Sequence, residues 1–154
     1  MKLSKNLSLS EVVKSNTATR LGIDNTPNEK VIENLKKTAE CIFQPIRDYF
    51  ESPIYISSGY RCPGLNRAIG GSETSEHCFG FALDLDQDGK NSGVSNSDIF
   101  RMIVQYLDFN QLIWEFGDDK NPDWVHVSYQ EGNNKKQVLR AMRVDGKTSY
   151  LPFT

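Results

Sequence analysis

Residues 75–84, Ser-Glu-His-Cys-Phe-Gly-Phe-Ala-Leu-Asp, hold one of the two histidines of the chain and a carboxylate seven residues after it. The other histidine lies in residues 123–128, Asp-Trp-Val-His-Val-Ser, which also contain a carboxylate. Two imidazoles and one carboxylate can bind a zinc ion and leave its fourth position open to water, as catalytic zinc sites do. We therefore expect the fold to bring His77, Asp84 and His126 together around one zinc ion.

Both stretches have the alternation of β-strands, over residues 81–85 and 124–130. In the second strand His126 shares a face with Trp124 and Ser128, while the two valines between them point the other way. His126 can then face a cleft while the valines fill the core. Asp84 shares its face with Ala82, which is small enough to leave room for an ion.

The rest of the chain predicts helices and further strands around these two. Capping boxes at residues 8–11 and 26–29 predict a short helix and a long amphipathic one, the second with Pro27 at its first position. We expect Pro45 to kink or end the long helix, with at most a last turn over 46–50. Further helices are predicted over 65–69 and 96–107, and further strands over 54–58, 111–116, 137–144 and 147–153. Asp145-Gly146 predicts a hairpin turn between the last two strands.

This order predicts an α+β fold, with helices packed on one face of a mainly antiparallel sheet and the zinc site in a surface cleft on the other face or at the edge. The length of 154 residues predicts a single domain over residues 1–154. A net charge of −2 gives no general attraction to nucleic acid. No apolar run approaches the ~20 residues that span a bilayer, so we expect no membrane insertion. The amino-terminal lysines are not followed by an apolar stretch, which predicts a cytoplasmic protein as synthesised, with its three cysteines reduced.

Two charged residues near these stretches suggest catalytic roles. Asp123, three residues before His126, is the candidate for the general base that takes a proton from water. In an ideal strand that spacing places two side chains on opposite faces, so Asp123 must lie in the turn that Asn121-Pro122 predicts. Arg61 is a candidate cation for a substrate carboxylate or a developing oxyanion. Glu115, inside an apolar run, is either a hydrogen-bond acceptor for a zinc ligand or a residue on the solvent face of an edge strand.

Other readings of these segments stay open. Residues 84–89 begin like a calcium-binding EF-hand loop, but the twelfth position is Ser95 rather than glutamate. Cys62 and Cys78 flank the site and are either packing residues or soft metal ligands. Because adjacent side chains diverge on an extended backbone, we do not expect Cys78 and His77 to bind one ion together.

Three segments together resemble the zinc peptidases of the M15 family, the group of D-alanyl-D-alanine carboxypeptidases and L-alanyl-D-glutamate endopeptidases. Residues 57–61 resemble the S-G-Y-R segment, residues 75–84 resemble S-x-H-x-x-G-x-A-x-D, and Asp123-x-x-His126 resembles the segment with the catalytic carboxylate and the last ligand. Leu65-Asn66 and residues 70–72 also resemble the subgroup found in phages and prophages. The similarity extends from about residue 7 to residue 129.

The resemblance implies the hedgehog/DD-peptidase fold, one Zn²⁺ and hydrolysis of peptide bonds in peptidoglycan stem peptides. It implies His77, Asp84 and His126 as ligands and Asp123 as the base. It also implies that Arg61, Tyr60 and Ser75 bind substrate. Dipeptidase members have glutamate in place of Asp123, which tilts the expectation toward an endopeptidase. We expect a monomer that acts on the cell wall, in a role such as that of a phage lysin. The alternative is a non-catalytic wall-binding or virion module that contains zinc.

Overall fold

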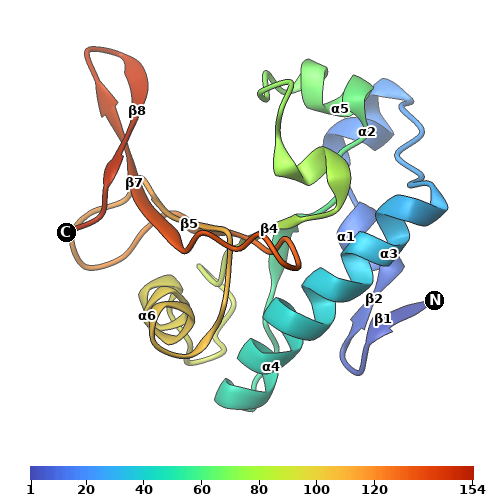
Figure 1. Ribbon diagram of the computed structural model, residues 1–154. Helices are drawn as coiled ribbons and strands as arrows, with labels where there is room; N and C mark the ends of the chain where they lie inside the picture. Colours follow the sequence, from blue (N-terminus) through green and yellow to red (C-terminus); the bar gives the residue numbers. More distant parts are fainter.

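The computed structural model describes all 154 residues and contains a six-stranded sheet in the order β3–β4–β6–β5–β7–β8 (Figure 1). Every neighbouring pair is antiparallel except β5 and β7, which are parallel. The strands are β3 (Ile56–Ser58), β4 (Ala82–Leu85), β5 (Gln111–Glu115), β6 (Trp124–Ser128), β7 (Gln137–Val144) and β8 (Lys147–Pro152). This confirms the α+β class with a mainly antiparallel sheet. A separate two-stranded sheet at the amino terminus, β1 (Lys2–Ser4) and β2 (Leu7–Ser8), was not predicted.

The helices are α1 (Leu9–Val13), α2 (Asn16–Leu21), α3 (Glu29–Thr38), α4 (Gln44–Phe50), α5 (Pro63–Ala68) and α6 (Asn96–Tyr106). A π-helical turn, η1 (Ala39–Phe43), joins α3 to α4, and a 3₁₀ helix, η2 (Glu76–Phe79), precedes β4. The capping box of the first helix is confirmed, since the backbone N–H of Ser8 donates to Glu11 at 2.9 Å. No helix is long and apolar enough to cross a bilayer.

The long helix departs from its sequence prediction at both ends. It begins at Glu29, two residues later than expected, because the Asn28 side chain caps it by accepting from the N–H of Val31 at 2.9 Å. Thr26 and Pro27 precede the helix. At the other end Pro45 does not stop it, and α4 continues for seven residues. The π turn lies directly before Pro45, with the N–H of Gln44 bonded to the carbonyl of Ala39, and its wider spacing accommodates a residue without an N–H.

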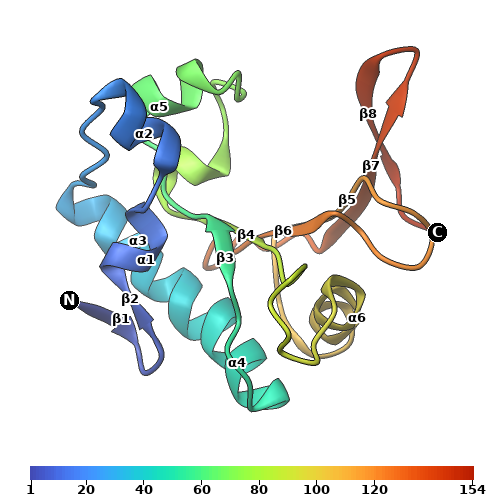
Figure 2. The ribbon, with the colours of Figure 1, turned by 180° about the vertical axis from the view of Figure 1, so that it is seen from behind.

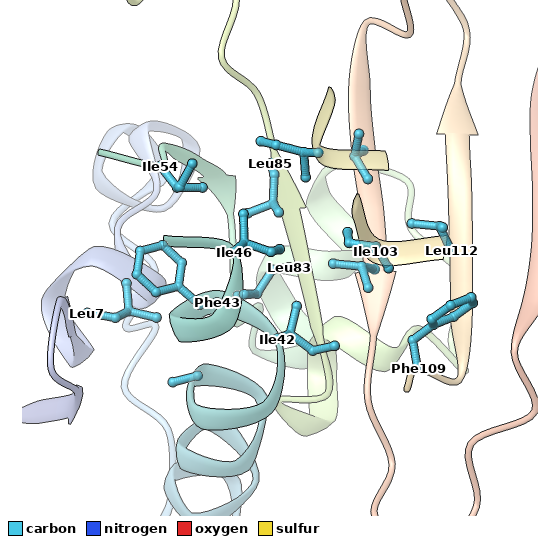
Figure 3. Packing of buried hydrophobic residues seen from close by; sticks show 14 of the residues in the cluster. Leu7, Ile42, Phe43, Ile46, Ile54, Leu83, Leu85, Ile103, Phe109 and Leu112 are labelled. Carbon is cyan, nitrogen blue, oxygen red and sulfur yellow. The ribbon is translucent and has the colours of Figure 1, made fainter. Parts of the chain in front are cut away.

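The apolar core lies between one face of the sheet and the helices α3–η1–α4 and α6 (Figure 3). Leu83 and Leu85 of β4 pack there against Ile42 and Ile46, and Ile103 of α6 packs beside Leu112 of β5. Val125 and Val127 of β6 are fully buried on this same face, as the alternation predicted. The other face of β4 and β6 is therefore left for the polar side chains of the same strands.

Not all helices lie on the core face of the sheet. Figures 1 and 2 show α2 and α5 gathered on the opposite side from α4 and α6, above the β3–β4 end of the sheet. At the other end the β7–β8 hairpin rises on that same side. The prediction that helices pack on one face was therefore incomplete: the chain between β3 and β4 crosses over and delivers residues 59–80 to the polar face.

Candidate functional site

The strand register brings the polar residues of β4 and β6 together. Asp84 lies directly opposite His126, and His126 lies directly opposite Ile113 on β5. Directly opposite residues in an antiparallel pair share a face of the sheet, with Cβ atoms about 5 Å apart. Both polar side chains are buried, at 9% and 8% exposure. The parity predicted for Asp84 and His126 is thus present in the register.

His77 reaches the same place from η2 rather than from a strand. Ser75 opens this 3₁₀ turn, its hydroxyl accepting from the backbone N–H of His77 at 3.3 Å. Gly80 closes the turn with φ of 79°, a conformation that favours glycine, and a Cβ there would lie 2.8 Å from the carbonyl of Val31. The expectation of an extended backbone at Cys78 was therefore wrong, because residues 76–79 are helical.

A backbone hydrogen bond fixes the ring of His77. Its Nδ1 lies 2.7 Å from the carbonyl oxygen of Gly59, so the ring proton belongs on Nδ1 and the lone pair on Nε2. The backbone at residue 59 also packs closely against Val12 and has no room for a side chain, since a Cβ on Gly59 would lie 2.4 Å from the carbonyl oxygen of Val12. Nε2 of His77 is buried without a hydrogen-bond partner and faces Oδ1 of Asp84 at 3.3 Å. Two lone pairs that face each other at this distance call for a cation between them.

The three side chains form a group with the dimensions of a metal site. Oδ1 of Asp84 is 3.1 Å from Nδ1 of His126 and 3.3 Å from Nε2 of His77, and all three ligand atoms lie within 4.8 Å of one another. Ligands at about 2.0–2.1 Å from a tetrahedral ion are about 3.3 Å apart. The structure brings no other group of three or more histidine, cysteine or acidic side chains this close together. The residues fit a divalent ion with two nitrogen ligands and one oxygen ligand.

The charges of the group stabilise one another. Burial by itself would raise the pKa of Asp84, but the positive charge that His77 and His126 can carry beside it and the hydrogen bond from His126 outweigh burial and hold that pKa far below its usual value. Burial would lower the pKa of His126, but the hydrogen bond to Asp84 and its charge raise it. Asp84 is therefore an ionised carboxylate and a competent ligand.

Arg61 stands next to the group. Its Nη2 lies 3.8 Å from the second carboxylate oxygen of Asp84, and its Nη1 donates to Oδ1 of Asn66 at 3.3 Å. Asn66 is itself held by a bond from its Nδ2 to the carbonyl of Ser72 at 2.7 Å. Asn66 thus holds the Arg61 guanidinium beside Asp84, where it can orient the carboxylate.

A groove of about 700 Å³ passes over these residues. Its floor contains the three candidate ligands together with Ile113 and Glu115, and Trp124 lies beside them. The segment from Gly71 to His77 lines one wall, and the β7–β8 hairpin lines the other with Gln137, Leu139, Arg143, Thr148 and Tyr150. Figure 1 shows these two walls as the green segment beside α5 and the red hairpin.

Glu115 is a buried carboxyl group on this floor. Its position two residues after Ile113 puts it on the same face as His126, and it is 7% exposed. Burial, helped by the nearby charge of Asp84, raises its pKa to about 7 against the opposing charges of His126 and Arg61. From the sequence, Glu115 was expected only as a hydrogen-bond acceptor for a zinc ligand or as a solvent-facing residue. Its occurrence inside an apolar strand was the one sign in the sequence that it could be buried.

Asp123 is exposed and does not line the groove. Its backbone N–H donates to the carbonyl of Glu115 at 2.8 Å, and its own carbonyl accepts from Nδ2 of Asn96 at 3.0 Å. Asp123 lines a neighbouring cavity instead, together with Phe116, Trp124 and Arg140. The structure therefore does not bring Asp123 together with the three candidate ligands.

The two residues named for substrate binding beside Arg61 lie in different places. Ser75 lines the groove, although its hydroxyl is engaged with the backbone of His77. Tyr60 is 7% exposed and packs in the apolar core. Its remaining surface lines a second cavity of about 400 Å³, which Arg61 also lines, rather than the groove.

The comparisons with known proteins identify a family. No curated protein matches the chain. The family model described as Peptidase M15 matches residues 5–128, which include Arg61, the three candidate ligands and Glu115. The match ends with β6, so the β7–β8 hairpin lies outside it. Since the matched residues are most of the chain, the protein belongs to the peptidase M15 family.

Proposed function

We propose that this peptidase is zinc-dependent and hydrolyses peptide bonds in peptidoglycan stem peptides. The observation that carries the proposal is the convergence of His77, Asp84 and His126 on one point of a groove floor, with ligand atoms at tetrahedral spacing. Membership of the M15 family supports the substrate class. When bound, zinc supplies the Lewis-acid chemistry that activates water and polarises a carbonyl.

We assign the general base to Glu115. A base must reach the water that attacks the substrate, and Glu115 lines the groove without being one of the three ligands. The other such carboxylate, Glu76, already accepts hydrogen bonds from Asn110 and Gln130. A pKa near 7 suits a group that takes a proton from water and later gives it to the leaving amine. Asp123 would have to leave the neighbouring cavity and pass Trp124 to do the same.

Arg61 is the proposed electrostatic partner of the reaction. Its guanidinium is held beside Asp84 by Asn66 and lines the groove, so it can stabilise negative charge on the carbonyl oxygen of the substrate. The buried setting strengthens this interaction, because it is less screened than one at an exposed surface.

The test is release of peptides from purified sacculi, followed by mass spectrometry, with and without a chelator. We expect chelation to abolish release and added zinc to restore it. Terminal D-alanine would identify a carboxypeptidase, and cleavage after L-alanine an endopeptidase, the type that the sequence favours. Activity that persists in the chelator would exclude the metal mechanism. Stoichiometric zinc without any cleavage would favour a wall-binding module instead.

Two matched variants test the base. Glu115→Gln keeps the size of the side chain and should retain zinc while kcat falls by a factor of about 10²–10⁴. Asp123→Asn makes the same chemical change outside the groove and should leave kcat within a few-fold of the wild type. The reverse pattern would assign the base to Asp123.

A further inference from the structure

The β7–β8 hairpin lies outside the matched residues yet forms a whole wall of the groove. Its register with the floor is direct: Glu115 of β5 pairs with Ala141 of β7, and Ala141 pairs with Tyr150 of β8. Ala141 is completely buried in this row. The hairpin is therefore attached to the catalytic floor without a flexible linker, and its groove-facing side chains have fixed places relative to Glu115.

Arg143 is the cation of this wall. The β5–β7 pairing ends at Ala141, whereas the β7–β8 pairing continues to Val144, so Arg143 stands beyond the end of β5. Two residues after Ala141, it shares the groove-facing side of β7. It lines the groove, and its guanidinium lies over the ring of Phe116, 5.2 Å from the ring centre.

No carboxylate neutralises Arg143. Of the other arginines near the groove, Arg61 lies 3.8 Å from Asp84 and Arg140 is bonded to Asp119 at 2.6 Å, whereas Arg143 forms no ion pair. The Phe116 ring packs against the Arg143 guanidinium and also contacts the ring of Trp124. The backbone of Phe116 is left-handed, with φ of 56°. Left-handed backbone is uncommon for an aromatic residue and is found where a side chain has to be aimed.

We propose that Arg143 binds a carboxylate of the substrate and makes the enzyme selective for peptides that carry one away from the scissile bond. The inference rests on the proposed function and names a residue that determines its specificity. Arg61, the other guanidinium that lines the groove, is already paired with Asp84, so Arg143 is the cation that remains for a carboxylate of the peptide. An unpaired guanidinium held over an aromatic ring presents the planar donors that suit a carboxylate.

The test measures binding, so that it does not depend on turnover. Zinc-loaded Glu115→Gln protein is titrated calorimetrically with the pentapeptide L-Ala-D-Glu-L-Lys-D-Ala-D-Ala. Matched peptides carry an amide in place of the free carboxylate of D-glutamate, or of the carboxyl terminus. We expect one of the two amides to bind about ten- to a hundredfold more weakly than the acid. Adding Arg143→Gln to this protein should weaken binding of the acidic peptide by the same factor and leave binding of that amidated peptide unchanged.

Arg140→Gln is the control, because it removes the same charge from the same strand on the side away from the groove. It should preserve the preference for the acid. The proposal is overturned if neither amide binds more weakly than the acid, or if Arg143→Gln leaves the preference intact. Failure of the proposed function would look different: the pentapeptide would bind with the expected preference, and wild-type protein would not cleave it.

Discussion

Among single residues, Glu115 is a buried carboxyl group whose ionisation opposes folding. Its pKa rises from an ordinary 4.5 to about 7, so between these values the folded protein holds a proton that the unfolded chain has released. Stability contributed by that proton is present at low pH and is lost as the pH rises through about 7. A rise of this size corresponds to about 3 kcal/mol.

We therefore expect Glu115→Gln to stabilise the metal-free protein at pH 8 by up to about 3 kcal/mol, with little effect near pH 4.5. Urea unfolding in a chelator at both pH values measures the difference. The same variant should lose turnover, so that it would be more stable and less active than the wild type. Equal stability of the two proteins at pH 8 would mean that Glu115 is hydrated rather than buried.

The same residue shows how far the sequence can identify a site. His77, Asp84 and His126 were predictable because the chain has only two histidines, and each lies near a carboxylate in a short segment. The position of Glu115 on the same face as His126 was not predictable, because it depends on which face of β5 pairs beside His126. That register is set by contacts between strands and cannot be read from spacing along one strand.

At the scale of elements, two residues before α3 are suited to cap the helix, and only one of them does so. Thr26 and Asn28 are both good capping residues, but the Thr26 hydroxyl bonds to Asp24 at 2.6 Å, whereas Asn28 accepts from the helix. The sequence located the helix to within a few residues and missed the cap, because the loop from Asp24 satisfies Thr26 first.

Replacement of Asn28 by alanine should destabilise the protein by about 1 kcal/mol, since the N–H of Val31 loses its partner. Thr26→Ala removes only an exposed bond within a loop and should change stability by less than about 0.5 kcal/mol. Urea unfolding of the two variants side by side decides between the caps. A larger loss for Thr26→Ala would restore the cap that the sequence predicted.

The contact of the segment after β3 with α1 links packing to the site. At Gly59 a methyl group would lie 2.4 Å from the carbonyl of Val12, and the carbonyl of Gly59 itself holds the His77 ring. Gly59→Ala should therefore destabilise the fold by about 1–3 kcal/mol and also weaken zinc binding, because the ring is released.

Gly64→Ala provides the comparison. Gly64 lies in α5, where a methyl group would meet nothing closer than the Arg67 side chain at 3.8 Å. There alanine should be neutral or slightly stabilising, with zinc affinity unchanged. Zinc titration and thermal unfolding of both variants test the link. Unaltered zinc affinity in Gly59→Ala would show that the backbone bond does not orient His77.

For the whole molecule, the apolar pattern was sufficient to predict the fold class and the core face. Val125, Val127, Leu83 and Leu85 lie where their alternation predicted, against the helices that amphipathic periodicity predicted. The parallel pairing of β5 with β7 and the crossover of residues 59–80 were beyond that pattern. Both depend on contacts between residues distant in sequence. Together they place a wall on each side of the polar face of the sheet and so form the groove.

The candidate ligands come from three elements: His77 from η2, Asp84 from β4 and His126 from β6, of which only β4 and β6 are paired in the sheet. An ion there would tie η2 to the sheet, opposite the core. Because zinc then binds the folded chain more tightly than the unfolded one, it should stabilise the protein by about 4 kcal/mol at a free concentration a thousandfold above its Kd. The Tm should rise with zinc and fall back in a chelator. His126→Ala should remain folded, since its side chain lies outside the apolar core, but its Tm should no longer respond to zinc. A zinc-dependent rise in Tm that survives His126→Ala would place the ion elsewhere and remove the basis of the proposed mechanism.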